Sequence, residues 1–162
     1  MSYHHQDQTA VDVFRAYFGD TYDVFSDASL DRLIDSNDTG YVSRTIREDY
    51  ITGTSLTIVL CGVDTWKRKY VDWEIHSTLL KDHALLGIML PNIQGAMQSD
   101  GQRRWLVPSR LHTNIEGGYA HFITWPENAA VLSTAIDHAV ARSEQLKHMK
   151  DNTAPKMARN AS

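Results

Sequence analysis

Glu74 is the residue of this sequence whose position most clearly suggests chemistry. A helix is predicted over residues 69–80, because its apolar side chains recur at helical spacing and form one stripe: Val71, Ile75 and Leu79. Glu74 falls at the border of that stripe, and Tyr70 lies one turn before it on the same side. A carboxylate at such a border is partly removed from water, which strengthens its electric field. The spacing alone also allows a surface glutamate paired with Lys67.

Three consecutive basic residues, Lys67, Arg68 and Lys69, crowd the start of this helix. The amino end of a helix carries a partial positive charge, so cations are locally unfavourable there. The arrangement becomes useful if these residues bind an anion, for instance a pyrophosphate. A solvated basic loop is the alternative that the sequence leaves open.

The histidines and the cysteine indicate neither a metal site nor a nucleophile. Of the eight histidines, His4 and His5 are adjacent, so on a strand they would point to opposite faces. The others show no spacing with cysteine or carboxylate that is typical of metal ligands, and we expect no metal site. Cys61 lies inside an apolar run, where a thiol is not expected to act as a nucleophile.

The elements that position these residues alternate between strand and helix. Residues 56–62 and 84–90 are continuous apolar runs, typical of strands buried on both faces, and they flank the helix at 69–80. The remaining expected elements are helices over residues 9–18 and 41–51, strands over 22–25 and 119–124, and a last helix with Pro126 in its first turn. This alternation predicts an α/β fold with a parallel sheet covered on both faces. Ligands of such sheets bind beyond the carboxyl ends of the strands.

Both ends of the sequence differ from the regular alternation of strands and helices between them. Residues 1–7 lead directly into a helix, so the first strand is either very short or truncated, with the sequence beginning downstream of the natural start. Residues 150–162 are polar and are predicted to be disordered. The remainder, residues 1–149, has the length of one domain.

A long segment over residues 91–118 is predicted to be irregular, because glycines and prolines recur in it. Loops of this length are often lids or interaction surfaces. It contains side chains that are able to bind a ligand: Arg103, Arg104, Trp105 and Arg110. They either contact the substrate or a neighbouring subunit, or belong to a surface loop with no such role.

Charge and hydropathy argue against several kinds of partner. The net charge is −4 and the sequence pI is about 6.0, so no global basic field attracts nucleic acid or an anionic membrane. The longest apolar runs are too short to cross a bilayer, and no signal segment opens the sequence. The single cysteine cannot form an internal disulfide. We therefore expect a cytoplasmic protein that binds neither nucleic acid nor a membrane.

Several motifs occur in an order that resembles the TIR-domain family. The run LTIVLCG is followed by TWKRKYVDWEI and then by ALLGIML. The segments SYHHQD, VFSDAS and PSRLHTN add to the likeness, which is greatest with the bacterial TIR-like group that includes the TIR protein of the Thoeris antiphage system. The resemblance covers about residues 2–125. It implies a TIR-like domain over residues 1–149, with a flavodoxin-like open parallel sheet, helices on both faces and an activity that consumes NAD+.

The resemblance also implies roles for individual residues. Glu74 would be catalytic, and Tyr70 would line the nicotinamide pocket, where tryptophan is more usual. His4 and Asp27 match polar positions around the pocket, and Thr65 joins them as a substrate-binding residue. NAD+ would be the substrate, with no cofactor. Because nicotinamide leaves as a neutral molecule, the enzyme has to stabilise an oxocarbenium-like ribose, and one carboxylate can do this.

The implied function is that of an NAD+ glycohydrolase or ADP-ribosyl cyclase in antiphage defence. The resemblance favours a cyclic ADP-ribose-type product that activates a separate effector protein, and it allows a homo-oligomer. Two alternatives stay open. One is a nucleoside deoxyribosyltransferase-like enzyme, which would use the same glutamate on another N-glycosidic bond. The other is a non-enzymatic TIR module that signals by assembly with other TIR domains.

Overall fold

The structure, a computed structural model, describes residues 1–18, 55–91 and 106–162. Its helices and strands follow in this order: α1 (Gln8–Phe18), β1 (Leu56–Cys61), α3 (Lys69–Leu80), β2 (Ala84–Met89), α4 (Ser109–Glu116), β3 (His121–Ile123) and α5 (Ala129–Gln145). Short 3₁₀ turns lie over His5–Asp7, Thr65–Lys67 and Lys147–Met149. The helix predicted over residues 41–51 and the strand predicted over 22–25 lie outside the described residues.

The strands β1, β2 and β3 form a parallel sheet in that order. Ser2 extends this sheet by a single parallel bridge to Val59 of β1. In this bridge the Ser2 N–H donates to the Ile58 carbonyl at 2.8 Å, and the Leu60 N–H donates to the Ser2 carbonyl at 2.9 Å. In the described residues the first strand is therefore represented by this single bridge, which agrees with both a very short and a truncated strand.

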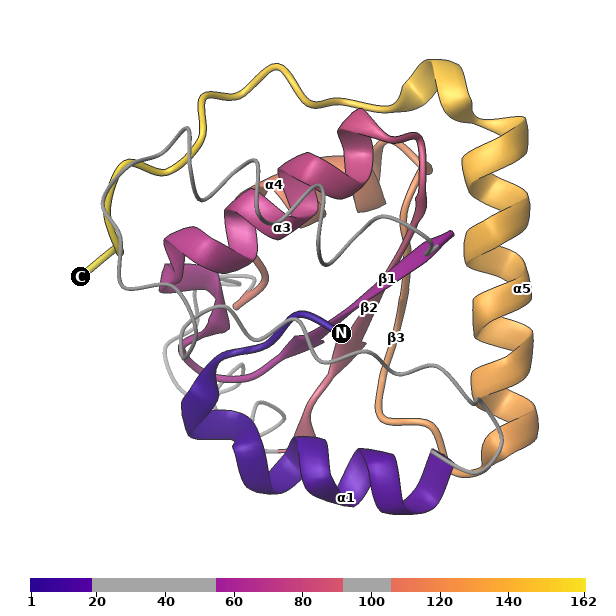
Figure 1. The fold of residues 1–162 in the computed structure, drawn as a ribbon. Helices are drawn as coiled ribbons and strands as arrows, with labels where there is room; N and C mark the ends of the chain where they lie inside the picture. The colour runs from indigo at the N-terminus through magenta and orange to yellow at the C-terminus, as the bar shows by residue number, and fades with distance from the viewer. Residues whose placement is uncertain (19–54, 92–105) are drawn as a thin grey trace, which may run out of the picture.

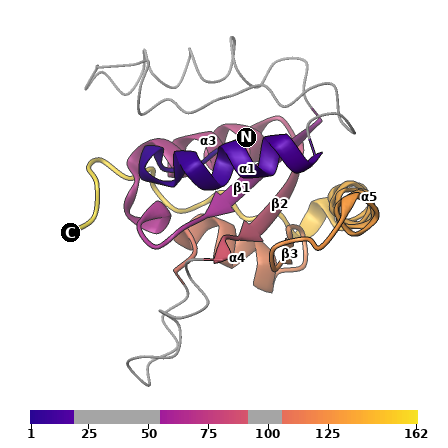
Figure 2. The same ribbon diagram turned by 90° about the horizontal axis from the view of Figure 1, so that it is seen from below.

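Helices cover both faces of the sheet (Figure 1). Successive side chains of a strand point to opposite faces, so Ile58 and Val59 enter different clusters of buried residues. The cluster beneath α1 and α5 includes Val11, Phe14, Ile58, Leu86 and Leu132. The cluster beneath α3 and α4 includes Val59, Ile75, Leu85, Leu111 and Tyr119. Figure 2 shows α5 beside β2 and β3. The predicted α/β fold with a doubly covered, open parallel sheet is confirmed.

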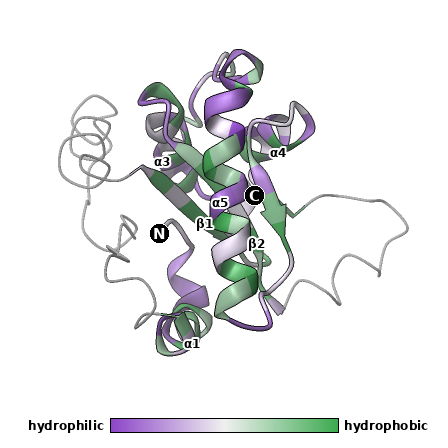
Figure 3. Ribbon diagram, turned by 90° about the vertical axis from the view of Figure 1, so that its right-hand side faces the viewer, coloured by the Kyte–Doolittle hydropathy of each residue, from purple (hydrophilic) through white to green (hydrophobic). Residues whose placement is uncertain are grey.

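The elements around β1 and β2 agree closely with the sequence prediction. Each strand ends one residue earlier than predicted, and α3 has the predicted bounds. All residues of β1 after Leu56 are buried, which explains its continuous apolar sequence. Figure 3 shows the strands in green and α5 in alternating green and purple, as expected for an amphipathic helix on a buried sheet. No helix among the described residues combines the length and the apolar character needed to cross a membrane.

The helix α4 corrects the prediction that residues 91–118 are irregular throughout. Leu111 is fully buried, and Ile115, four positions later, packs against the same cluster. Gly117 ends the helix, so only eight residues carry the helical pattern. Two apolar positions in so short a segment give too weak a periodic signal to identify a helix.

The last helix begins later than predicted. The side chain of Asn128 accepts a hydrogen bond from the Val131 N–H at 3.1 Å and so caps the amino end of α5. Pro126 therefore lies before the helix and not in its first turn.

Residues 150–162, called the C-terminal strap below, also differ from the prediction. They contain no helix or strand, yet they follow an ordered path over α3 (Figure 1). Their backbone is held by side chains of α3 and α4, such as Asp72, Trp73 and Arg110. The polar composition of the segment gives no sign of these contacts, because its hydrogen-bond partners lie elsewhere in the chain.

We expect acid to destabilise the fold because three histidines are half-buried. Burial is the main cause that lowers the pKa of His76, His83 and His121 below their ordinary value. In the unfolded chain these side chains would bind protons at a pH of about 6.5, so below that pH the unfolded state binds more protons than the folded state. The free energy of unfolding should therefore fall between pH 7.5 and 5.5. Urea unfolding at both values measures this change.

The same experiment has an internal control. His121→Gln removes one of these groups and should reduce the dependence of stability on pH, whatever its effect at pH 7.5. Equal urea midpoints at the two pH values for the unsubstituted protein would contradict the prediction.

Candidate active site

Glu74 lies in the middle of α3 and is 3% exposed. The neighbouring residues Val71 and Ile75 are buried against the sheet, which brings the carboxylate close to the interior of the domain. The sequence predicts a partly desolvated side chain, and the structure removes it almost entirely from water. This burial does not agree with the alternative of a surface glutamate. The pairing with Lys67 is not seen either, because the Lys67 ammonium lies 2.8 Å from Asp64 Oδ1.

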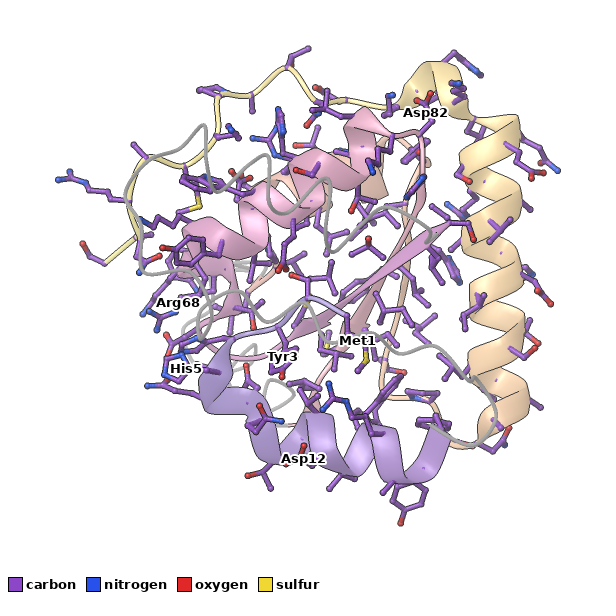
Figure 4. The ribbon with its side chains drawn as sticks, viewed as in Figure 1. Met1, Tyr3, His5, Asp12, Arg68 and Asp82 are labelled. Atoms are coloured by element: carbon purple, nitrogen blue, oxygen red, sulfur yellow. The ribbon has the colours of Figure 1, made fainter. Side chains whose placement is uncertain are left out.

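His4 approaches the same face of the sheet from the short first strand. Tyr3 packs in the cluster beneath α1 and donates a hydrogen bond to Gln8 (Figure 4). The next residue of an extended chain points to the opposite face, so His4 is directed to the side that α3 covers. His4 is fully buried, and its ring meets that of His5 edge to face at 4.3 Å between centroids. His4 and Glu74 thus belong to different elements but to one face of the sheet.

The loop at the carboxyl end of β1 contributes further polar side chains. Asp64, in the loop that follows β1, has a pKa below its ordinary value, mainly because Lys67 donates a hydrogen bond to it. Figure 4 shows His5 and Arg68 at the same end of the sheet. This is the end at which parallel sheets bind ligands.

Tyr70 lies one turn before Glu74 and is partly buried. Its ring meets the ring of Trp73 edge-on, with 5.6 Å between the centroids. The Lys69 ammonium lies 4.9 Å from the centroid of Tyr70, a distance at which a cation and an aromatic ring attract each other. The ring is therefore held at the amino end of α3 by contacts with its own helix.

Thr65 is fully buried and shapes the loop between β1 and α3. Its hydroxyl oxygen accepts a hydrogen bond from the Gly62 N–H at 2.8 Å. The hydroxyl lies 3.3 Å from Asp7 Oδ2 and 3.4 Å from the Leu60 carbonyl, either of which can accept its proton. These contacts support a role for Thr65 in fixing the loop on which the site is built.

Asp7 lies beside Thr65 at the candidate site, although the sequence does not single it out. Its carboxylate is buried at the start of α1 and lies against the loop after β1, beside Thr65. After burial itself, the charge of Asp7 is the second cause that raises the pKa of the Cys61 thiol, so the thiol stays protonated. The sequence offers only a weak signal for Asp7, an acidic residue at the start of a helix. Its contact with a loop so far along the chain has no local signature.

Gly62 is required where Asp7 approaches the backbone. A Cβ atom added at Gly62 would lie 2.1 Å from Asp7 Oδ2. Gly62→Ala should therefore lower the free energy of unfolding by about 1–3 kcal/mol, because the buried carboxylate has to move. Urea unfolding measures the loss. The cost should shrink when Asp7 is also replaced by alanine, which removes the atoms that clash.

A second glycine provides the comparison for this test. At Gly117 the nearest atom to an added Cβ, the Met149 carbonyl oxygen, is 3.2 Å away, so Gly117→Ala should cost less than Gly62→Ala. A Gly62→Ala protein as stable as the unsubstituted one would show that the carboxylate does not occupy this position.

Two of the three basic residues at the start of α3, Lys67 and Lys69, have contacts within the protein. Lys67 pairs with Asp64, and its backbone carbonyl accepts a hydrogen bond from the Ala161 N–H at 2.8 Å. The Lys69 N–H donates to the Asn160 side-chain oxygen at 3.0 Å. The end of the C-terminal strap therefore occupies part of the helix terminus that the sequence assigns to an anion. The anion site stays a prediction.

The remaining candidates separate into described and undescribed residues. Asp27 lies outside the described residues, as do Arg103, Arg104 and Trp105. Arg110 is described and is 3% exposed, with its Nε 2.9 Å from Asp72 Oδ1. Arg110 is therefore an internal residue. The sequence left open a ligand contact or a surface loop with no role, and neither interpretation applies to Arg110. No group of His, Cys, Asp and Glu side chains in the described part of the chain is arranged to hold a metal ion.

The open parallel sheet, with a buried glutamate on the helix that follows β1, is compatible with a TIR-like domain. The family model described as "Thoeris protein ThsB, TIR-like domain" matches residues 1–94 of the 162 residues, and the chain belongs to this family. The match includes every predicted site residue: His4, Asp27, Thr65, Tyr70 and Glu74. Comparison with curated proteins and with solved structures gave no match. Family membership supports a TIR-type role in antiphage defence.

Proposed function

We propose that the protein is a TIR-type enzyme that cleaves NAD+ at the bond between nicotinamide and ribose. The observation that carries this proposal is the burial of Glu74, which is 3% exposed on the face of the sheet toward which His4 is directed. A desolvated carboxylate at that place suits a substrate whose ribose becomes cationic during the reaction. Membership of the Thoeris TIR-like family supports the same activity. We expect the reaction to take place in the cytoplasm.

The chemistry requires charge stabilisation and does not require a proton donor. The pyridinium ring of NAD+ takes the electron pair of the broken C–N bond and leaves as neutral nicotinamide. The positive charge then resides on the ribose as an oxocarbenium ion. Glu74 faces this cation with a fixed negative charge, which is effective because little water surrounds it.

The other predicted residues orient the substrate in this proposal. Tyr70 stacks against the nicotinamide ring, and its edge-on contact with Trp73 holds the ring in place. His4 and Asp27 bind polar groups around the ribose. Thr65 acts through the loop that it fixes after β1, where its hydroxyl bonds the Gly62 N–H at 2.8 Å.

Tyr70→Ala tests the assigned stacking. Loss of the ring should raise the KM for NAD+ by about 2- to 10-fold, the equivalent of one aromatic contact. Tyr70→Trp should retain the stacking and keep KM near that of the unsubstituted protein. Tyr17→Ala, on the exposed outer side of α1, removes a similar ring and should leave KM unchanged. Steady-state nicotinamide release measures all three, and an unchanged KM in Tyr70→Ala would contradict the assignment.

We further propose that the ribosyl cation is captured by a nucleophile of the same molecule. This gives a cyclic ADP-ribose-type product that activates a separate effector protein. Water is the competing acceptor, and its attack would give ADP-ribose and release a proton. The burial of Glu74 supports cyclisation, because a closed site limits the access of water. Assembly into a homo-oligomer on activation is compatible with this scheme.

Product analysis of the activated protein distinguishes the proposed function from its alternatives. Full-length protein from phage-infected cells is incubated either with NAD+ or with a mixture of free deoxynucleosides and bases, and the products are identified by mass spectrometry. Nicotinamide release supports the proposal. Base exchange between nucleosides would instead indicate a nucleoside deoxyribosyltransferase-like enzyme. Neither reaction, together with intact phage resistance, would indicate a TIR module that signals by assembly.

A further inference from the structure

The C-terminal strap follows α3 from its carboxyl end to its amino end (Figure 1). At the carboxyl end, the Lys150 ammonium donates to the Leu79 carbonyl at 2.8 Å. In the first half of the helix, the Met157 N–H donates to Asp72 Oδ2 at 2.9 Å. Just before the helix starts, the Ala161 N–H bonds the carbonyl of Lys67. The strap therefore contacts the whole length of the helix that carries Glu74.

A buried ion pair between Asp72 and Arg110 joins the strap to α3 and α4. Arg110 Nε lies 2.9 Å from Asp72 Oδ1, and Arg110 Nη2 lies 3.4 Å from Asp72 Oδ2. The two side chains are only 8% and 2% exposed. The remaining donors of Arg110 reach the strap: Asn152 Oδ1 at 2.9 Å, the Ala154 carbonyl at 3.0 Å and the Pro155 carbonyl at 3.1 Å. One guanidinium thus binds α3 and three residues of the strap.

Two further hydrogen bonds join the same side of α3 to the C-terminal strap. The indole N–H of Trp73 donates to the Met157 carbonyl at 2.7 Å, and Trp73 is 1% exposed. The side-chain amide of Asn152 donates to the His76 carbonyl at 3.1 Å. The side of the helix around Asp72 is therefore held by directional hydrogen bonds as well as by packing.

Glu74 projects from another side of this helix. Successive residues of an α-helix are separated by about 100°, so Asp72 and Glu74 lie about 200° apart around the axis. A rotation or translation of α3 that breaks the contacts at Asp72 also displaces the Glu74 carboxylate. An arginine fork fixes orientation better than apolar packing, because its two parallel bonds are directional. Buried ion pairs are often no more stabilising than apolar residues of similar size. This pair therefore contributes mainly by fixing the orientation of α3.

We propose that Asp72, Arg110 and the C-terminal strap are positioning elements that set the place of the Glu74 carboxylate relative to the substrate. This inference rests on the proposed cleavage of NAD+. Asp72 and Arg110 act through the helix and do not touch the substrate. Without their contacts α3 still folds against the sheet through Val71, Ile75 and Leu79, but its rotation is less restricted.

The double variant Asp72→Asn with Arg110→Gln tests the proposal. It keeps two polar side chains in contact and leaves no single charge buried. At a temperature well below the unfolding midpoint, kcat for nicotinamide release should fall by about 10- to 100-fold, as expected for a misplaced reactive group. KM should change by less than roughly threefold, because the substrate-binding groups stay in place. Hydrogen exchange of the backbone amides of α3 should become faster.

Trp73→Phe provides a milder second variant. It keeps an aromatic ring but loses the N–H that donates to the Met157 carbonyl. A smaller decrease of kcat in the same direction is expected. If the double variant does not fold, Trp73→Phe decides the question, and an unchanged kcat in it overturns the proposal.

Arg142→Gln is the matched control. It removes a hydrogen bond of 3.1 Å from Arg142 Nη1 to the Gly118 carbonyl, which joins α5 to the turn after α4 and involves no residue of α3. Its kcat should equal that of the unsubstituted protein even if its unfolding temperature falls. A folded double variant with unchanged kcat, or an equal loss of kcat in Arg142→Gln, overturns the positioning role. Absence of nicotinamide release by the unsubstituted, activated protein contradicts the proposed function itself, and the positioning role with it.

Discussion

Glu74→Gln is expected to lower kcat for nicotinamide release by a factor of about 100 to 1,000, the loss found when one group that stabilises transition-state charge is removed. The amide has nearly the same shape as the carboxylate but carries no charge. The oxocarbenium-like ribose would then form beside a neutral group, within a site where water cannot replace the missing charge. Chromatographic measurement of nicotinamide released from NAD+ by the activated protein gives the ratio directly.

Two controls separate this effect from a loss of folded protein. Glu116→Gln makes the same chemical change at a side chain that is 70% exposed on α4, and it should leave kcat unchanged. The unfolding temperature of Glu74→Gln should be similar to or higher than that of the unsubstituted protein, because a buried amide is more easily desolvated than a buried charge. A Glu74→Gln protein that releases nicotinamide at the normal rate would exclude the proposed role of this residue.

Arg110→Met is expected to produce the largest loss of stability. The substitution leaves the Asp72 carboxylate buried, with a weakened set of partners. Removal of one member of a buried ion pair typically costs about 3–5 kcal/mol, most of which is the penalty of the uncompensated charge. The three hydrogen bonds from Arg110 to the strap are lost as well. Urea unfolding should show this decrease in the free energy of unfolding.

Replacing both members of the pair tests the assigned cause. Asp72→Leu combined with Arg110→Met removes both charges, so the double variant should be more stable than Arg110→Met alone. The exposed ion pair of Lys147 and Asp82 serves as a comparison for the buried pair, because its side chains are 61% and 36% exposed. Lys147→Met should cost less than about 1 kcal/mol. If Arg110→Met costs no more than Lys147→Met, the pair does not fix the strap as described.

The sequence was sufficient where burial and periodicity are local. The strands β1 and β2 are continuous apolar runs, and α3 has an apolar stripe over three turns, so all three were predicted almost to the residue. The places of Glu74 and Tyr70 on α3 follow from helical spacing for the same reason. The chemical roles proposed for them rest on the resemblance to the family.

The sequence was insufficient where structure depends on distant partners. The contacts of the strap join residues far apart in the chain, such as Asp72 and Met157, and no spacing rule connects them. Polar composition alone therefore suggested disorder. The approach of Asp7 to Gly62 is of the same kind, because it depends on how the start of α1 meets the end of β1. Arg110 was assigned to a loop because α4 is too short to show a clear period.

The most direct test of the central claim is mass spectrometry of nucleotides in phage-infected cells that carry either the unsubstituted protein or Glu74→Gln. With the unsubstituted protein, NAD+ should fall after infection, nicotinamide should rise, and a cyclic ADP-ribose-type compound should appear. Cells with Glu74→Gln at equal protein abundance should show none of these changes. Unchanged NAD+ in infected cells that the unsubstituted protein nevertheless protects would contradict the claim that this TIR-like protein acts by cleaving NAD+.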